Sequence, residues 1–170
     1  MTLLVAGCHG VGKTYLAKPA AQQLGLRYAT ASQLIREERG RATWATSRQV
    51  TEIDENQAAL VRAVTRILSD GERLLLDGHL VLRSRPHEHQ RLDPEVFRGL
   101  QCRRIVVLTA PAPVLLSRLI ARGDETWTEE EVVSISNAEV EHGKLVAASL
   151  GVPLIALDAP DADEFRAALL

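Results

Sequence analysis

Short hydrophobic runs alternate along this chain with longer segments that carry helical signals. Five runs predict strands that are largely buried, at residues 2–6, 26–29, 74–77, 105–108 and 152–157. Helices are predicted between them, at residues 13–24, from 32 onward, and at 51–68, 111–122, 128–150 and 162–170. This alternation indicates an α/β fold of three layers, a parallel sheet of about five strands with helices on both faces. A chain of 170 residues fits one such domain over residues 1–170.

Polar or small residues stand at the carboxyl ends of four predicted strands. They are Gly7, Asp77, Thr109 and Asp158. In an open parallel sheet the carboxyl ends meet at one edge, and ligands bind beyond that edge. Pro19 lies inside the first predicted helix, where it removes a hydrogen bond, so a kink or a break is expected there.

Residues 7–14 read Gly-Cys-His-Gly-Val-Gly-Lys-Thr, which is the P-loop pattern between a strand and a helix. Its glycines let backbone N–H groups surround phosphate oxygens, and the following helix directs its positive end at the same anion. Lys13 supplies a positive charge for the β- and γ-phosphates, and the Thr14 hydroxyl is a Mg²⁺ ligand. We therefore expect ATP to bind at Gly7, His9, Gly10, Val11, Gly12, Lys13, Thr14 and Tyr15.

Asp77 follows the third predicted strand directly, beside the expected phosphate site. A carboxylate at this place holds magnesium in P-loop proteins, so Thr14 and Asp77 are the predicted metal ligands. The alternative is an Asp-Gly pair that only forms a turn.

Three further segments resemble the adenylate kinase and nucleoside monophosphate kinase family, and most closely its compact archaeal branch. They are Ser32-Gln33-Leu34-Ile35-Arg36, Asp77-Gly78-His79 followed by Arg83 and Ser84, and Leu116 to Arg122 with arginines four residues apart. A fourth, Asp158-Ala159-Pro160, stands where this family packs its last strand-to-helix loop against the donor base.

The resemblance implies transfer of the γ-phosphate of ATP to a nucleoside monophosphate. It places Arg118 against the adenine and Arg122 at the transferring phosphate, with Ala159 and Pro160 beside the base, and Lys144 where the archaeal proteins have an arginine. The implied catalytic residues are Lys13, Asp77, Arg118 and Arg122. Acceptor binding is assigned to a helical segment at about 30–70, with Ser32, Arg36, His79, Arg83, Arg85 and Lys144, and a short lid to about 122–128.

Purely structural interpretations, without a role in binding or catalysis, remain open for several of these residues. Arg118 and Arg122 share one helix face, which is also typical of a solvated surface. Trp44 and Trp127 either stack on a base or fill the edge of the core. The segment from Arg83 to Arg91, with histidines at 87 and 89, is expected to be a solvated loop, because the histidine spacing is poor for structural zinc.

Composition restricts the partners. A net charge of −2 and the absence of a basic stripe argue against DNA, and no apolar run reaches the roughly 20 residues that span a bilayer. With two cysteines and no export signal, a cytoplasmic protein is expected, as a monomer or a small homo-oligomer. The expected partner is a nucleotide or another small phosphate acceptor.

Other functions remain possible on the same P-loop. They are a nucleotide-dependent switch or ATPase that acts with a protein partner, a polynucleotide kinase, and a kinase of a small metabolite of the shikimate or gluconate type. If an acceptor exists, Arg36, Arg83 and Arg85 should converge with Lys13 around a cavity.

Overall fold

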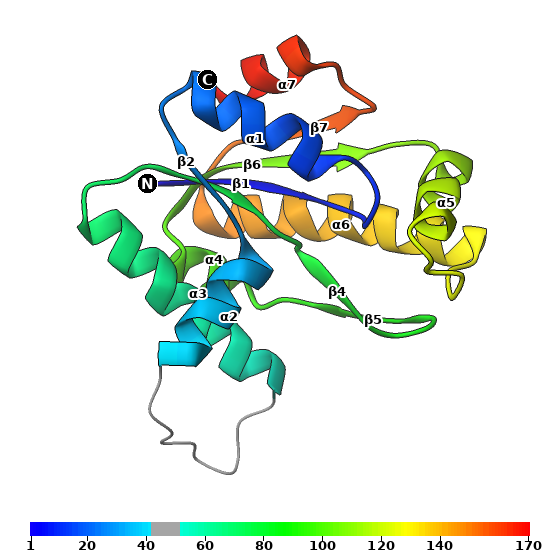
Figure 1. Cartoon of the computed structure of the whole chain (residues 1–170), viewed down its shortest axis with the longest axis horizontal. Coiled ribbons are helices and arrows are strands. Elements are labelled where there is room, and N and C mark those ends of the chain that lie inside the picture. The colour runs from blue at the N-terminus through cyan, green and yellow to red at the C-terminus, as the bar shows by residue number, and fades with distance from the viewer. Residues whose placement is uncertain (42–51) are drawn as a thin grey trace.

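A parallel five-stranded sheet forms the centre of the computed structural model, which describes residues 1–41 and 52–170 (Figure 1). The strand order is β2–β3–β1–β6–β7. In chain order the strands are β1 (Thr2–Gly7), β2 (Arg27–Thr30), β3 (Leu74–Asp77), β6 (Cys102–Thr109) and β7 (Leu154–Asp158). The predicted fold class is confirmed.

Helices cover both faces of the sheet (Figure 1). One face carries α1 (Lys13–Gln23) and α7 (Ala162–Leu169); the other carries α3 (Glu52–Ser69), α4 (Pro94–Gly99) and α6 (Glu129–Leu150). The helix α2 (Ala31–Arg41) packs against α3, and α5 (Ala112–Ala121) lies beside α6. The central strands are therefore buried on both sides, as their uninterrupted hydrophobic runs predict.

The strand ends meet as the sequence indicates. Gly7, Asp77, Thr109 and Asp158 each end a strand, and all of these strands are parallel. The edge of the sheet that carries the P-loop therefore also carries Asp77.

The expectation of a solvated loop between β3 and β6 is wrong. This segment forms an antiparallel hairpin of β4 (Val81–Arg85) and β5 (Glu88–Arg91), followed by α4. Val81 is fully buried, but most of the later hairpin side chains are exposed or half-buried, so hydrophobic alternation is weak. For α4, Asp93 accepts a hydrogen bond from the Glu95 N–H and Pro94 occupies the first turn, so a helix start is encoded there.

Of the kink or break expected at Pro19, the break does not occur: α1 runs through Pro19 to Gln23. Pro19 and Tyr15, four residues earlier, are both exposed. The carbonyl group that loses its helical donor is therefore on the solvent side, where water can satisfy it. Trp44 lies outside the described residues.

Candidate functional site

The P-loop forms a tight turn between β1 and α1. Gly7 has φ +139°, and a Cβ there would lie 2.4 Å from the Leu108 carbonyl oxygen, so a side chain does not fit. Gly12 caps α1 in the left-handed conformation and has no side chain to satisfy the N–H groups of the first helical turn. The loop therefore presents backbone donors and the positive end of α1, which together suit a phosphate chain.

The Lys13 ammonium group lies within this turn. Its Nζ donates to the Gly7 carbonyl at 2.8 Å and to the Cys8 carbonyl at 3.3 Å, and the residue is 8% exposed. Burial lowers the pKa of Lys13, while the nearby Asp77 and Glu139 raise it. Phosphate oxygens of a nucleotide would offer this buried charge a stronger acceptor than the two carbonyls do.

Thr14 and Asp77 meet where the metal site is predicted. The Thr14 hydroxyl donates to Asp77 Oδ2 at 2.8 Å, and the Tyr28 hydroxyl donates to the same oxygen at 3.0 Å. A hydroxyl and a carboxylate are the hard oxygen donors that Mg²⁺ prefers, so these residues fit the ion. Elsewhere in the described ranges, no three His, Cys, Asp or Glu side chains cluster as metal ligands would, His87 and His89 included.

A buried carboxylate that the sequence analysis missed lies next to the P-loop. Glu139, in α6, is fully buried; it contacts His79 Nδ1 at 3.0 Å and accepts from the Leu80 N–H at 2.9 Å. Burial raises the pKa of Glu139 to about 7 and lowers that of His79 to about 3. The His79 ring stacks on His9 of the P-loop, with ring centroids 4.3 Å apart. Glu139 lies on α6, 60 residues from its partner His79, so no local sequence pattern could have identified it.

The two arginines of α5 and its end occupy different places. Arg118 donates to the Gly10 carbonyl at 3.1 Å and to the Val11 carbonyl at 3.4 Å, so it holds the backbone of the P-loop. Arg122, at the C-terminal end of α5, lines the cavity described next. Contact of Arg118 with adenine stays a prediction, as does the role of Ala159 and Pro160, which are not among the cavity residues.

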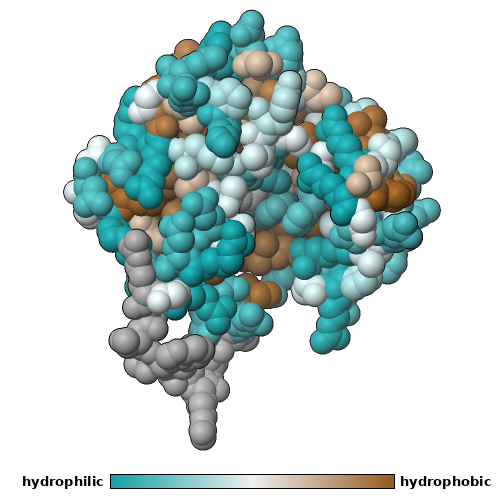
Figure 2. Space-filling model, viewed as in Figure 1, coloured by the Kyte–Doolittle hydropathy of each residue, from teal (hydrophilic) through white to brown (hydrophobic). Residues whose placement is uncertain are grey.

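A cavity of about 760 Å³ opens from the P-loop towards α2, α3 and the β4–β5 hairpin. Figure 2 shows the hollow between these elements, with hydrophilic surface around hydrophobic residues at its floor. The volume suits a small metabolite. Of the residues predicted to bind the acceptor, Ser32, His79 and Arg83 line this cavity, whereas Arg36, Arg85 and Lys144 are exposed and are not in its lining.

The comparisons with known proteins agree on the fold. A family model described as an AAA domain (AAA_17) matches residues 6–135, while a search of curated proteins finds no significant match. Shikimate kinase from Acinetobacter baumannii, in complex with shikimate, is 16% identical with a TM-score of 0.60, and the match covers 98% of this chain and 88% of that chain. A gluconokinase from Sinorhizobium meliloti 1021 is 16% identical, with a TM-score of 0.55 and 99% and 90% covered.

A further matched structure holds a nucleotide. The YorR protein of Bacillus subtilis, in complex with phosphorylated GDP, is 18% identical with a TM-score of 0.60, and 98% of this chain and 92% of that chain are covered. At such identities these likenesses show a shared fold.

Proposed function

We propose that this chain, which belongs to the AAA domain family and shares the fold of P-loop kinases, transfers the γ-phosphate of ATP to a hydroxyl group of a small polar metabolite. ATP and Mg²⁺ are the cofactors of this proposal. A nucleoside monophosphate acceptor, which the sequence resemblance favours, becomes the second candidate. The match to a protein that binds phosphorylated GDP is the observation that keeps it.

The observation that carries the proposal is the chemistry of the cavity wall on the acceptor side. Three arginines are predicted to bind the acceptor, and of these only Arg83 lines the cavity in the described part of the chain. Its guanidinium is already paired with Glu131 and hydrogen-bonded to Thr126. A phosphate group of a monophosphate acceptor would have to compete with both partners.

Uncharged polar groups make up much of the remaining polar wall. They are hydroxyls and amides, which suit an acceptor with several hydroxyl groups: Thr30, Ser32, Asn56, Gln57 and Ser84. Gln57 is 8% exposed, and its Oε1 has no hydrogen-bond partner among the residues that the structure describes. A buried amide oxygen without a partner is costly, and a hydroxyl donor of a bound acceptor would remove that cost.

The roles of the P-loop residues follow from phosphoryl transfer chemistry. Lys13 and Arg122 place positive charge near the phosphates, where negative charge spreads in the transition state. Thr14 and Asp77 would hold Mg²⁺, which when bound would neutralise negative charge on the phosphates. Alignment of the acceptor hydroxyl with the γ-phosphate depends on the cavity wall.

Two of the matched structures are a shikimate kinase in complex with shikimate, which is a hydroxylated metabolite, and a gluconokinase; their names support the proposed class of acceptor. The test is to incubate the protein with ATP and Mg²⁺ and a panel of sugars, sugar acids, other polyols and nucleoside monophosphates. ADP formation and the mass of the phosphorylated product are measured, with Lys13→Ala as the inactive control. We expect a phosphorylated compound that is not a nucleotide.

Two results would overturn this proposal. Turnover with a nucleoside monophosphate alone would support the adenylate kinase-like activity that the sequence suggests. Hydrolysis of ATP without any phosphorylated organic product would support the switch or ATPase. Three expectations stay predictions: the division into an acceptor segment and a lid, the cellular location, and the oligomeric state. Among the helices that the structure describes, none has the length and hydrophobicity of a membrane span.

A further inference from the structure

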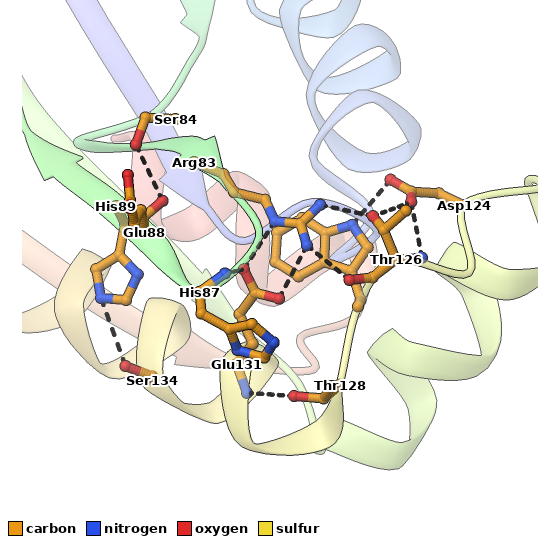
Figure 3. A network of polar contacts seen from close by, with 11 residues as sticks. Arg83, Ser84, His87, Glu88, His89, Asp124, Thr126, Thr128, Glu131 and Ser134 are labelled. Carbon is orange, nitrogen blue, oxygen red and sulfur yellow. Dashed lines mark hydrogen bonds and ion pairs between the residues drawn. The ribbon is translucent and has the colours of Figure 1, made fainter.

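Arg83 connects the β4–β5 hairpin to the first turn of α6. Its Nε donates to Glu131 Oε1 at 2.7 Å and its Nη2 to Glu131 Oε2 at 2.9 Å, which is a bidentate pair (Figure 3). The side chains are 13% and 1% exposed, respectively. A planar guanidinium can make this fork and a lysine cannot, so the geometry depends on the residue type as well as on the charge.

The same guanidinium holds the segment between α5 and α6, residues 122–128, which we call the lid segment. Arg83 Nη1 donates to Thr126 Oγ1 at 2.8 Å, and Nη2 donates to the Thr126 carbonyl at 2.8 Å (Figure 3). With the pair to Glu131, these contacts use donors on all three guanidinium nitrogens. Little of the group remains for a substrate.

Trp127 completes this contact. The Arg83 guanidinium carbon lies 3.9 Å from the centre of the Trp127 ring, and Trp127 is 6% exposed. The Asp124 carboxylate accepts from the Trp127 indole N–H at 2.9 Å and from the Thr126 hydroxyl at 2.6 Å. The turn of the lid segment is therefore closed on itself and fixed to β4 through one arginine.

Electrostatics favour the paired state. Glu131 also accepts from the His87 N–H at 2.7 Å, and its own N–H is capped by the Thr128 hydroxyl at 3.2 Å. The hydrogen bond with Arg83 lowers the pKa of Glu131 and raises that of Arg83, so both groups stay charged over the physiological range. A buried carboxylate without its arginine would be left uncompensated.

We propose that Arg83 and Glu131 are positioning residues that hold the lid segment against the P-loop before nucleotide binds. The lid segment begins at Arg122, which lines the cavity, and Trp127 lies beside His9 of the P-loop, with ring centroids 5.8 Å apart. Fixing the segment therefore fixes where Arg122 stands relative to the phosphates. The consequence for phosphate transfer rests on the proposed function, whereas the state of the lid segment in the free protein does not.

Hydrogen–deuterium exchange on the free protein tests the structural part. Arg83→Ala should increase exchange of the amides at 123–128 on the order of tenfold or more, because local opening no longer has to break the fork. Arg83→Lys and Glu131→Gln, which are milder changes, should each give a smaller increase. The matched control is Arg91→Ala, which removes an exposed arginine of the same hairpin that pairs with Glu141 at 3.5 Å and should leave the lid segment unchanged.

Steady-state kinetics test the part that concerns the reaction. Arg83→Ala should lower kcat and leave the KM for ATP nearly unchanged, and it should have little further effect when Arg122 is already alanine, because Arg83 acts through Arg122. Unchanged exchange at 123–128 in all three variants would overturn the proposal. So would a rise in the acceptor's KM alone, which would make Arg83 a substrate ligand. A protein that phosphorylates no acceptor would refute the proposed function, while the exchange result would still decide the role of Arg83.

Discussion

Replacement of Asp77 by Asn separates a metal-binding role from a turn-forming one. Asp77 Oδ2 accepts from Thr14 at 2.8 Å and from Tyr28 at 3.0 Å, and the residue is 7% exposed at the end of β3. Asparagine keeps an oxygen that can accept both hydrogen bonds but removes the negative charge. The fold should therefore survive while the attraction for Mg²⁺ is lost.

The two effects are separated by what is measured. Neutral hydrogen bonds contribute about 0.5–1.5 kcal/mol and those to charged groups about 1.5–3 kcal/mol, so weakening both bonds in Asp77→Asn should lower the free energy of unfolding by roughly 2–3 kcal/mol. The loss of a charge that holds the metal should lower kcat by on the order of 100-fold, about 2.7 kcal/mol of transition-state stabilisation. The concentration of Mg²⁺ needed for half-maximal rate should rise as well.

Tyr28→Phe is the matched control. Burial raises the pKa of Tyr28 to about 12, so its hydroxyl is a neutral donor to the same Asp77 oxygen. Removing it takes away one hydrogen bond to the carboxylate and no charge, with a stability loss of about 1.5–3 kcal/mol. Its effect on the Mg²⁺ dependence should be small by comparison.

The assay is the initial rate as a function of Mg²⁺ concentration at saturating ATP, with thermal unfolding of each variant recorded in parallel. If Asp77→Asn keeps the wild-type rate and the wild-type Mg²⁺ dependence, Asp77 is only a turn residue and the metal assignment fails. If Tyr28→Phe matches Asp77→Asn in both, the loss comes from the shape of the site and not from the charge.

Three further changes test other parts of the site. Lys13→Ala should lower kcat, with a loss of several kcal/mol of transition-state stabilisation, while circular dichroism shows an intact fold. Unchanged turnover would refute the P-loop assignment. Gln57→Leu should raise the KM of a hydroxylated acceptor and leave that of ATP unchanged, whereas Arg36→Ala, at an exposed site outside the cavity lining, should affect neither unless the acceptor is a nucleoside monophosphate. Because the pKa of Glu131 is lowered in the folded state, its contribution to stability is present at neutral pH and is lost as pH falls through the folded-state pKa. Glu131→Gln should therefore make the melting temperature less sensitive to acid in a series from about pH 7 to about pH 3.

The fold and the phosphate site were open to prediction because their signals are local. A buried parallel strand is a continuous hydrophobic run, and the P-loop is a fixed pattern of glycines, lysine and threonine within eight residues. The placement of Gly7 and Asp77 at the same edge of the sheet followed from the rule that the carboxyl ends of parallel strands lie at one edge. Each of these inferences needed a few neighbouring residues and one general rule.

The hairpin between β3 and β6 was missed because its strands do not alternate in the usual way. Only Val81 at its start is fully buried, and the pairs Arg83 with His89 and Arg85 with Glu88 carry polar side chains on both strands. A strand that is stabilised by contacts with α6 and not by a hydrophobic face has no period-two pattern to detect.

The role of each arginine depends on partners that sequence cannot place. Arg83 appears beside a motif that suggests phosphate binding, yet its partner Glu131 is 48 residues away and joins it only because α6 packs against β4. Arg118 is similarly engaged with the P-loop backbone, 108 residues earlier in the chain. A cation that is already paired with a buried carboxylate is less available to a substrate, and this pairing is decided by tertiary packing. The sequence therefore identifies the lysines and arginines that are candidates for the site. Whether the site suits an acceptor phosphate or an acceptor hydroxyl depends on how many of these cations are already paired with carboxylates of the protein.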